Sequence, residues 1–487
     1  MAGGVLSWNH FLVGVFYDDG IYAGLAWAIG HGAGFVYPNL PGTPAAIHFP
    51  PLFPLLLAPF FAIWSPAVAG AIGRALGIIC FALACRLIVR HAVSRRLLGD
   101  DTPPWVTEAL VAAAALAIPV LSILGVLLSE PAFTLTLALI IVLGDRPASE
   151  WSGGRAWGVG LLAAGALLLR SVGVAALAGL LVVAWRIRLP RRHVLTLVLP
   201  GVLAVVGWGL WVTAHRAGID PAIGPDYGSY LETVHDAGVR TFVGSLTDLP
   251  RPLSVLTLNW VPATWVYYGL GIPALVVGGW GICVLTRRSL LGWVLIAYLG
   301  VLALWPFPPD RFLWAILPWL LLAWVAGAVA LWRRKSRVLR GSVALLALAL
   351  AFGYVRYEAR GFSGHWWDLT AGRISSNMAE LLPAVDSLPA DAVVATDNEP
   401  LVWLYTRRQS VPFYLFAYSG RQLLQPRPEF QLSYLRRIGV THVLLSGLNT
   451  GSAAQLDRLL GAYPGMLTVT RRWSGGRALF ELKRDHP

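Results

Sequence analysis

Long apolar runs separated by short arginine clusters constrain this chain more than any other feature. Runs long enough to cross a membrane lie at about 66–89, 105–128, 194–213, 262–285, 313–332 and 341–357. Shorter apolar runs lie at 131–144 and 290–305. Only 13% of the 487 residues are charged and 56% are hydrophobic, whereas about a quarter of the residues of a soluble protein are charged. The pattern predicts an α-helical polytopic membrane protein.

Four arginine clusters indicate which loops share one side of the membrane. They are "RLIVRHAVSRR" (86–96), "RIRLPRRH" (186–193), "TRRS" (286–289) and "WRRKSRVLR" (332–340). Loops of this kind face the cytoplasm, so the net charge of +13 does not indicate nucleic-acid binding. Lys335 and Lys483 are the only lysines, and neither follows a phosphate-binding glycine-rich loop, which argues against ATP-driven transport.

The stretch 156–185 is apolar throughout except for Arg170 at its centre. A single helix of this length would measure about 45 Å, too long for a membrane core of about 30 Å. All four arginine clusters lie on one side of the membrane only if this stretch is a hairpin that enters the membrane and returns to the same side, and if 131–144 crosses the membrane. Arg170 and Ser171 would then lie at the hairpin tip. Residues 1–359 would make about ten or eleven transmembrane passes, counting the hairpin arms.

The composition changes after residue 360. Short β-strand patterns occur in "DAVVATDNE", "THVLLSG" and "LTVTRRW", and helical patterns lie near 373–387, 429–438 and 452–462. We therefore predict a soluble α/β domain over 360–487. By the same count of passes it lies on the non-cytoplasmic side, as does a polar loop at 214–261.

The same face receives a set of ionisable residues that neighbour the membrane. They are Asp18, Asp19, His48, Glu130, Arg170, Asp310 and Arg311. Ionisable residues at this depth are costly and often functional. Each one alone could be a snorkelling or helix-capping charge, but the convergence of acids and cations on one face suggests a site.

The first external loop, 17–65, is the most distinctive part of the chain. It contains "FYDDGIYAGLAW" (16–27), a glycine- and proline-rich connector, and "HFPPLFPLLLAPFF" (48–61). The prolines favour a helix start but interrupt a clean span, so we expect two helices lying along the membrane surface. Asp18 and Asp19 would point about 100° apart on a helix and cannot address one reacting centre equally. Tyr22 shares the Asp18 face and could stack on a sugar or anchor at the interface.

This loop resembles that of the GT-C superfamily of glycosyltransferases, most of all the bacterial branch related to protein O-mannosyltransferases and aminoarabinose transferases. The resembling elements are the acidic pair followed by Gly-x-Tyr, the glycine-rich connector and the Pro-Pro-Leu-x-Pro-Leu element after His48. "LLSEPAFTLTLAL" (127–139), "LRSVG" (169–173) and "DRFLWAILPWLLL" (310–322) also resemble family segments. The resemblance implies sugar transfer from a polyprenyl-phosphate carrier on the periplasmic or extracellular side of the bacterial inner membrane.

The resemblance also implies roles for individual residues. Asp18 matches the catalytic aspartate, and Glu130 matches an acidic residue that would join it in the catalytic set. His48 stands where many members have a lysine near the donor phosphate, so this contact would be weaker or pH-dependent. The donor-phosphate set is His48, Arg170 and Arg311, and the substrate-binding set is Asp19 and Tyr22. Alternatively, Asp19 caps the helix or pairs with a cation.

The chemistry of these side chains fits the implied reaction. Displacing a phosphate from an anomeric carbon passes through an oxocarbenium-like state, and a carboxylate can take the proton of the attacking hydroxyl. Arginine can neutralise the leaving phosphate, so no cofactor is required, although a divalent metal is not excluded. A single displacement would invert the anomeric carbon. The expected partners are the lipid-linked sugar, a glycan, lipid or protein acceptor and membrane lipid, with no nucleic acid.

Other functions remain open at this stage. A flippase or exporter of lipid-linked sugars without transferase activity would explain the hydrophobicity, but it predicts internal repeats and polar residues at mid-membrane, which are not visible. A polysaccharide ligase or polymerase leaves the acidic pair unexplained, and a membrane scaffold leaves residues 16–60 unexplained. The sequence does not identify the sugar, the acceptor or the length of the carrier lipid.

Overall fold

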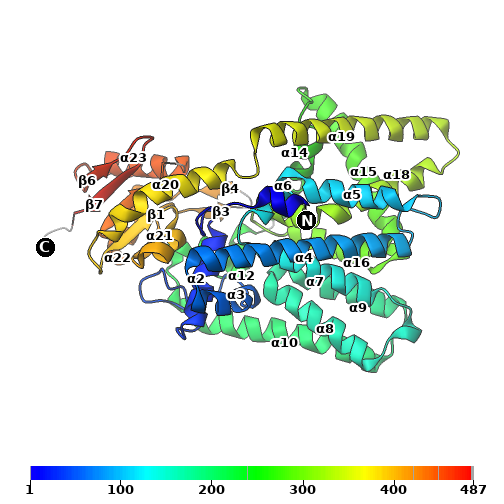
Figure 1. The fold of residues 1–487 in the computed structure, drawn as a ribbon, viewed down its shortest axis with the longest axis horizontal. Helices are drawn as coiled ribbons and strands as arrows, with labels where there is room; N and C mark the ends of the chain where they lie inside the picture. The colour runs from blue at the N-terminus through cyan, green and yellow to red at the C-terminus, as the bar shows by residue number, and fades with distance from the viewer. Residues whose placement is uncertain (1, 239, 420–421, 448, 484–487) are drawn as a thin grey trace.

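The computed structural model describes residues 2–238, 240–419, 422–447 and 449–483. A helical bundle and a smaller domain built around a β-sheet lie one after the other along the longest axis (Figure 1). A short N-terminal helix, α1 (Ala2–Ser7), packs against the bundle. The predicted class, a polytopic helical protein with a C-terminal α/β part, is confirmed.

Four helices of the bundle are individually long and apolar enough to cross a membrane. They are α4 (Pro66–Ser94), α10 (Arg191–His215), α15 (Thr264–Arg288) and α19 (Arg337–Gly364). A fifth pass is the bent pair α5 (Pro104–Leu116) and α6 (Ile118–Leu124), whose axes differ by 61°. The bend lies next to Pro119, which cannot donate a backbone hydrogen bond.

The remaining predicted passes are shorter apolar helices. They are α7 (Glu130–Gly144), α8 (Gly153–Leu169), α9 (Val174–Arg186), α16 (Leu290–Ala303) and α18 (Leu317–Trp332). With 13 to 17 residues each, they measure about 20–26 Å and fall short of a core of about 30 Å. By length alone, helices able to span the membrane are fewer than the predicted passes, and several of the short helices stop beside the cavity described below.

The predicted hairpin is present. Helix α8 ends at Leu169, Arg170 is extended (φ −153°), a 3₁₀ turn follows at Ser171–Gly173, and α9 returns. A Cβ added at Gly173 would lie 2.3 Å from the backbone carbon of Ala166, so only glycine permits this close reversal. Arg170 is thereby placed at the tip, as predicted.

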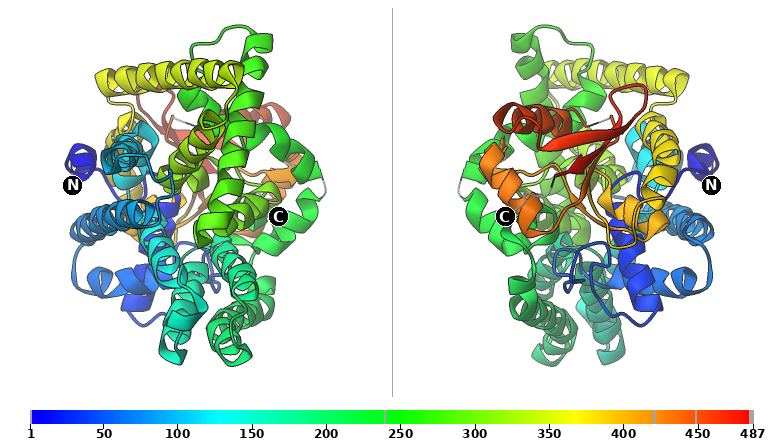
Figure 2. Two further views of the ribbon diagram at one scale, coloured as in Figure 1. Left: turned by 90° about the vertical axis from the view of Figure 1, so that its right-hand side faces the viewer. Right: turned by 90° about the vertical axis from the view of Figure 1, so that its left-hand side faces the viewer.

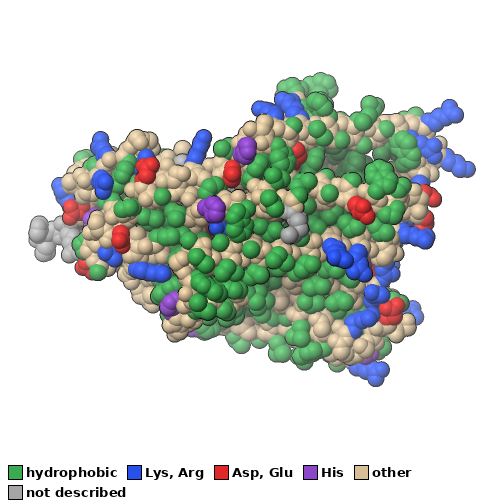
Figure 3. Space-filling model, viewed as in Figure 1, with side chains coloured by type: hydrophobic (Ala, Val, Ile, Leu, Met, Phe, Trp, Pro, Cys, Tyr) green, Lys and Arg blue, Asp and Glu red, His purple; other side chains and the backbone are tan. Residues whose placement is uncertain are grey.

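The four arginine clusters meet at the bundle end that lies away from the sheet. Arg288 Nη1 donates to the Arg96 carbonyl (2.6 Å), and Arg186 Nη1 donates to the Thr286 carbonyl (2.6 Å). Figure 3 shows blue side chains gathered at this end and a broad apolar surface between the two ends. The clusters therefore share one end of the molecule, and its cytoplasmic orientation stays a prediction.

The first external loop forms two helices, α2 (Asp18–Gly30) and α3 (Leu52–Ile63). Helix α2 is buried along most of its length against α3 and α21 (Glu399–Thr406), and the position of the two helices along the membrane surface stays a prediction. Close approach explains this burial: a Cβ added at Gly20 would lie 2.9 Å from the Pro400 side chain.

The stretch 214–261, predicted as a polar loop, is mostly helical. It contains η3 (Arg216–Gly218), η4 (Pro221–Ile223), α11 (Gly224–Tyr227), α12 (Tyr230–Ala237), α13 (Arg240–Asp248) and α14 (Arg251–Thr257). Short caps explain the early turns, since Asp220 accepts from the Ala222 amide and Ser229 from the Leu231 amide. A further short helix, α17 (Asp310–Ala315), precedes α18, and η1 spans Ala148–Glu150.

The C-terminal part contains a five-stranded mixed sheet in the order β2-β1-β5-β7-β6. Its strands are β1 (Val393–Thr396), β2 (Gln409–Pro412), β5 (His442–Leu445), β6 (Leu467–Arg472) and β7 (Ala478–Leu482). Strands β1, β2 and β5 are parallel, whereas β7 is antiparallel to β5 and β6. A separate pair joins β3 (Ala417–Ser419) and β4 (Gln422–Leu424).

Helices pack around this sheet (Figure 2). They are α20 (Leu369–Asp386), α21, α22 (Pro428–Arg437) and α23 (Thr450–Ala462). The three predicted strands correspond to β1, β5 and β6, and the three predicted helices to α20, α22 and α23. The sequence did not reveal β2, β7 or α21. The division of the chain into domains at 359/360 stays a prediction.

Candidate active site

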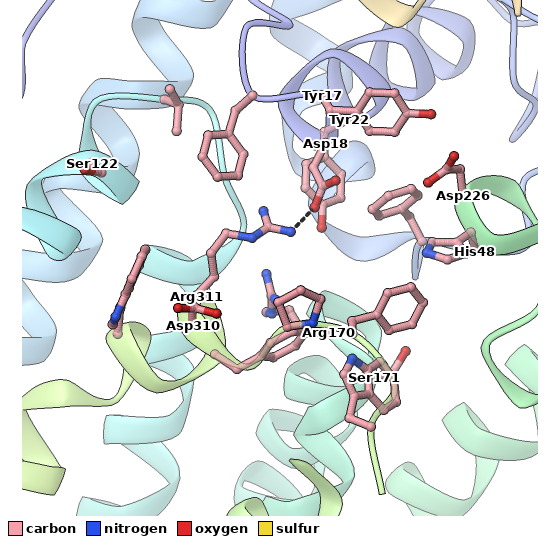
Figure 4. A pocket seen from close by; sticks show the side chains of 18 of the residues that line it. Tyr17, Asp18, Tyr22, His48, Ser122, Arg170, Ser171, Asp226, Asp310 and Arg311 are labelled. Carbon is pink, nitrogen blue, oxygen red and sulfur yellow. Dashed lines mark hydrogen bonds and ion pairs between the residues drawn. The ribbon is translucent and has the colours of Figure 1, made fainter. Parts of the chain in front are cut away.

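A cavity of about 520 Å³ lies where the first external loop, the hairpin tip, the 214–261 segment and the sheet domain meet (Figure 4). The hairpin tip between α8 and α9 and the segment between α16 and α18 contribute to its lining. Its lining includes most of the ionisable residues predicted for the site, namely Asp18, Tyr22, His48, Arg170, Asp310 and Arg311. Residues far apart in the sequence are thus brought together as predicted.

A tight turn presents Asp18 to the cavity. Tyr17 has φ 71° and ψ −70°, and the Asp18 amide donates to the Phe16 carbonyl at 3.0 Å, which together define a γ-turn. This conformation is strained for a residue other than glycine, so its surroundings must hold it in place. The Tyr17 hydroxyl donates to Glu399 of the sheet domain, which fixes the side chain of the turn residue.

Asp19 holds the backbone of that turn instead of facing the cavity. Its carboxylate accepts from the amides of Gly14 (2.9 Å) and Phe16 (2.8 Å), and its side chain is buried. Burial raises the pKa of Asp19 to about 6, although these backbone hydrogen bonds oppose the rise. The predicted substrate-binding role of Asp19 is therefore not supported, because both carboxylate oxygens are engaged by the backbone.

Two arginines and two carboxylates form a cluster at the cavity floor. Arg311 Nη2 lies 2.5 Å from Asp18 Oδ2, and its Nη1 lies 3.7 Å from Glu130 Oε1. Arg170 Nη1 lies 2.8 Å from Glu130 Oε1 and donates to the Ser129 hydroxyl at 3.1 Å. Charged groups at this depth require partners, and here each cation has at least one.

Each guanidinium of the cluster also lies over an aromatic ring. Arg311 lies 4.9 Å from the Phe16 ring centroid and Arg170 lies 4.6 Å from that of Phe312. Arg311 Nη1 is buried and has no hydrogen-bond partner within the described part of the chain. The cavity floor therefore holds a positioned cation with an unused donor.

Glu130 lies behind the arginines. Its side chain is 1% exposed and is not part of the cavity lining, and it pairs with Arg170 and Arg311. Direct contact between Glu130 and a substrate, as a catalytic role would require, is therefore not supported. Its geometry suits a positioning residue that holds two guanidinium groups toward the cavity.

His48 lines the cavity, but its surroundings disfavour a cation. Burial lowers the pKa of His48 to about 4, so the imidazole is neutral at pH 7. Its Nδ1 lies 2.8 Å from the Gly228 carbonyl and must donate there, which leaves Nε2 as a hydrogen-bond acceptor. The predicted charge contact of His48 with the donor phosphate is therefore not supported, whereas a contact with a hydroxyl group is possible.

Tyr22 is largely committed to packing. Its ring makes edge contacts with Phe49 (5.1 Å between centroids) and Phe53 (4.9 Å), and its hydroxyl lies 3.1 Å from Ser129 Oγ. The side chain also lines the cavity. Stacking of its ring on a sugar stays a prediction.

Sequence reasoning missed an aromatic and acidic wall of the cavity. The wall includes Asp226, Tyr230, Trp305, Phe307, Trp366, Trp367 and Tyr418. Burial, and secondarily the charge of Asp18, raises the pKa of Asp226 to about 7. The prolines and aromatics of "WPFPPDRF" were a usable signal. Asp226 lies in the 214–261 segment, where the sequence allows a contribution to an acceptor site but favours a solvated loop. Within the described ranges, no group of three or more His, Cys, Asp or Glu could hold a metal ion.

Comparison with known proteins gives likeness of fold only. No model of a protein family matches the sequence, and no curated protein matches it. The crystal structure of ArnT from Cupriavidus metallidurans bound to undecaprenyl phosphate matches with 16% identity and a TM-score of 0.45, over 99% of this chain and 96% of that one.

Oligosaccharyltransferase structures from Archaeoglobus fulgidus also match. The apo form has 13% identity and a TM-score of 0.43, over 91% of this chain and 68% of that one. The complex of AglB with an inhibitory peptide and a dolichol-phosphate has 12% identity, the same TM-score and the same coverage.

Proposed function

We propose that this protein is a membrane glycosyltransferase that moves a sugar from a polyprenyl-phosphate donor to a hydroxyl acceptor. The observation that carries the proposal is the Asp18–Arg311–Glu130–Arg170 cluster at the floor of the cavity. It places a carboxylate able to accept a proton beside two guanidinium groups able to bind a phosphate. The resemblance of the first external loop to GT-C enzymes supports the same reading.

Arg311 and Arg170 would bind the phosphate of the donor. Their forked donors match phosphate oxygens, and charge-assisted hydrogen bonds of this kind are strong in a cavity with apolar walls. As the sugar leaves, negative charge grows on the phosphate oxygen, and fixed cations stabilise that charge more in the transition state than in the ground state. Glu130 keeps both guanidinium groups in place.

Asp18 would act as the general base. The acceptor oxygen attacks the anomeric carbon while the bond from that carbon to the phosphate oxygen breaks. The hydroxyl proton passes to Asp18, and the electron pair leaves with the polyprenyl phosphate. General-base catalysis contributes about 10²- to 10⁴-fold, and a single displacement inverts the anomeric carbon.

Donor binding would free Asp18 for this task. Without donor, Asp18 Oδ2 is paired with Arg311 Nη2 at 2.5 Å, so this oxygen is engaged by the cation. An incoming phosphate competes for Arg311, whose Nη1 lacks a hydrogen-bond partner among the described residues. Donor and base are thereby coupled, which would discourage reaction before the donor is bound.

Replacement of the two neighbouring aspartates tests the proposal. In a deletion strain, the wild-type gene should restore a missing sugar unit in the cell envelope, detected by mass spectrometry of glycans, lipids and glycoproteins. Asp18→Asn should reduce transfer at least about 100-fold while the protein accumulates normally. Asp19→Asn should retain catalysis but lower the thermal stability, because an amide cannot accept from both backbone donors.

The outcome separates the proposal from its alternative. A flippase or exporter of lipid-linked sugars does not need a general base, so Asp18→Asn would restore the sugar unit as well as the wild type does. Near wild-type transfer by Asp18→Asn combined with loss in Asp19→Asn would reverse the roles within the pair.

We further propose that the cavity and the sheet domain face the periplasm or the cell exterior. The arginine-rich end supports this orientation by the positive-inside rule. With the native cysteines changed to alanine, Arg472→Cys in the sheet domain should react with an impermeant maleimide added to intact cells. Lys335→Cys should react only after lysis. The opposite labelling pattern would reject both the orientation and the proposed side of transfer.

A further inference from the structure

A second, smaller cavity adjoins the first. Its volume is about 150 Å³, and Tyr17 and Asp226 line both cavities. The sheet domain supplies the rest of its lining, which consists of Thr396, Asp397, Glu399, Pro412, Tyr414, Phe416 and Asn449. About 10–15 Å³ suffices for one water, so the cavity has room for a group considerably larger than water.

The charges of the two cavities differ. Three carboxyl groups (Asp226, Asp397 and Glu399) line the small cavity, and its described lining contains no lysine, arginine or histidine. Arg170 and Arg311 line only the large cavity. A phosphate or carboxylate would therefore be attracted to the large cavity, whereas the described lining of the small one offers it no cation.

Glu399 leaves a polar atom unpartnered at this site. The residue is fully buried, and its Oε1 accepts from the hydroxyls of both Tyr17 and Tyr227, the latter at 3.0 Å. Its Oε2 is buried with no hydrogen-bond partner among the described residues. A buried polar atom left unpaired destabilises the fold, and a bound group that forms a hydrogen bond with it would relieve that cost.

Asp226, on the opposite wall, is also available. Among the described residues, none donates a hydrogen bond to its carboxyl group. Figure 4 shows its side chain beside His48 and Tyr17, on the side of the large cavity away from Arg311. A molecule held between Asp226 and Glu399 would reach past Tyr17 toward Asp18, which directly follows Tyr17 in the chain.

The protonation of these carboxyls fits neutral polar ligands. Burial raises the pKa of Asp226 to about 7 and that of Glu399 to about 8. A carboxyl that holds its proton near pH 7 can both donate and accept a hydrogen bond, as a hydroxyl group also does. Tyr414 and Phe416 add aromatic surface of the kind that packs on the carbon faces of polar rings.

We propose that this small cavity is the acceptor subsite and that it holds an uncharged, hydroxyl-rich group such as a neutral sugar residue. The inference rests on the proposed function and names the substrate class of its acceptor. The donor phosphate occupies the arginine end and the acceptor occupies the carboxyl end. The acceptor hydroxyl reaches Asp18, which lies between the two ends.

Binding to the purified full-length protein in detergent tests this assignment. The acceptor probes are the methyl glycosides of mannose, galactose and arabinose, with methyl glucuronide as an anionic counterpart, measured by saturation-transfer NMR. Decaprenyl phosphate, followed by tryptophan fluorescence, reports on the donor end. We expect at least one neutral glycoside to bind, and methyl glucuronide to bind at least about tenfold more weakly than that glycoside, because the described lining of the small cavity offers no cation to pair with its carboxylate.

Variants locate the bound glycoside. Asp226→Leu and Glu399→Gln should weaken glycoside binding about fivefold or more and leave decaprenyl phosphate binding unchanged. Arg311→Ala should do the reverse. Glu429→Gln, an exposed carboxylate of the same domain that lines neither cavity, should change neither measurement. Asp226→Asn, which loses no hydrogen bond from a described residue, serves as the second variant if Glu399→Gln disturbs folding.

Several outcomes would overturn the inference. Failure of every neutral glycoside to bind would reject the subsite, as would glycoside binding that ignores both Asp226 and Glu399. Equal or tighter binding of methyl glucuronide would reject the uncharged class. Failure of the proposed function is distinguishable, because it would appear as absence of decaprenyl phosphate binding to the wild type or as its insensitivity to Arg311→Ala.

Discussion

Arginine is concentrated at both ends of the helical bundle, but it is held differently at each. At the cavity end, Arg170 and Arg311 are largely removed from solvent, paired with carboxylates and stacked on aromatic rings. At the opposite end, Arg186, Arg288 and Arg333 are more exposed and bind backbone carbonyls or Asp101.

The difference shows why residue type alone does not reveal a site. Exposed arginines near the last carbonyls of helices are inexpensive and suit an interface rich in lipid head groups. Buried arginines carry a desolvation penalty that is offset only by well-placed partners. Retention of two such arginines around one cavity is therefore the observation that needs a functional explanation.

Removal of a carboxylate at each end should give the sharpest contrast. Glu130→Gln leaves Arg170 buried without its carboxylate partner and should lower the free energy of unfolding by about 3–5 kcal/mol. Asp101→Asn removes the 90%-exposed partner of Arg333 and should cause no measurable change in the free energy of unfolding. Unfolding in mixed detergent micelles measures both. Equal losses would mean that burial does not distinguish the two ends.

The pH dependence of the free energy of unfolding should give the next largest difference between the buried carboxyls near the cavity and the exposed carboxylates at the opposite end. Burial raises the pKa of Glu399 from 4.5 to about 8, so between these values the folded protein holds a proton that the unfolded chain releases. The contribution of Glu399 is fully present below about pH 4.5 and is lost as the pH rises through about 8. The fall should be on the order of a few kcal/mol.

Glu399→Gln should reduce that fall because glutamine cannot ionise, while Asp19 and Asp226, whose pKa values are also raised, keep part of it. Asp101→Asn, at the exposed end, should follow the wild-type curve. Unfolding measured at intervals from pH 4.5 to 8.5 tests this. A wild-type curve that rises with pH across the window would contradict the assigned direction.

Arginine replacement at each end should affect donor binding unequally. Arg311→Ala should weaken decaprenyl phosphate binding by about 10- to 100-fold, the range for loss of charge-assisted hydrogen bonds. Arg333→Ala should leave the affinity unchanged, because this side chain lies at the far end of the bundle. Fluorescence titration of both variants is the measurement. Similar small effects would reduce Arg311 to a snorkelling charge.

The smallest effect is expected for an exposed pair outside both clusters. Arg437 of α22 binds Asp220 with two contacts of 2.9 Å, and the arginine is about half exposed. Arg437→Ala should lower the free energy of unfolding by about 0.2–1 kcal/mol and leave transfer unchanged. A loss as large as that of Glu130→Gln would show that tethering of the sheet domain, not burial, dominates stability.

Much of the architecture could be predicted because it depends on local properties. Apolar length predicted the helical passes. Placing all four arginine clusters on one side of the membrane predicted the hairpin with Arg170 at its tip. Alternating patterns predicted β1, β5 and β6. The patterns of β2, β7 and α21 were not recognised, because their residues gain stability from neighbours in the sheet rather than from propensity. The lengths of the short helices could not be predicted, because several of them end at a cavity that exists only in the folded protein.

The sequence by itself determined that this is a membrane protein, that its arginine clusters share one end, and that Asp18, Arg170 and Arg311 deserve attention. Hydrophobic length, charge spacing and the FYDDG stretch are local features of the sequence and do not depend on tertiary contacts. Only the tertiary structure decided that Asp18 meets Arg311 across 293 positions, that Asp19 serves the turn, that His48 is neutral, and that Glu399 and Asp226 line a second cavity. Burial and the identity of each partner set the charge and availability of these groups, and both depend on segments that the chain brings together only by folding.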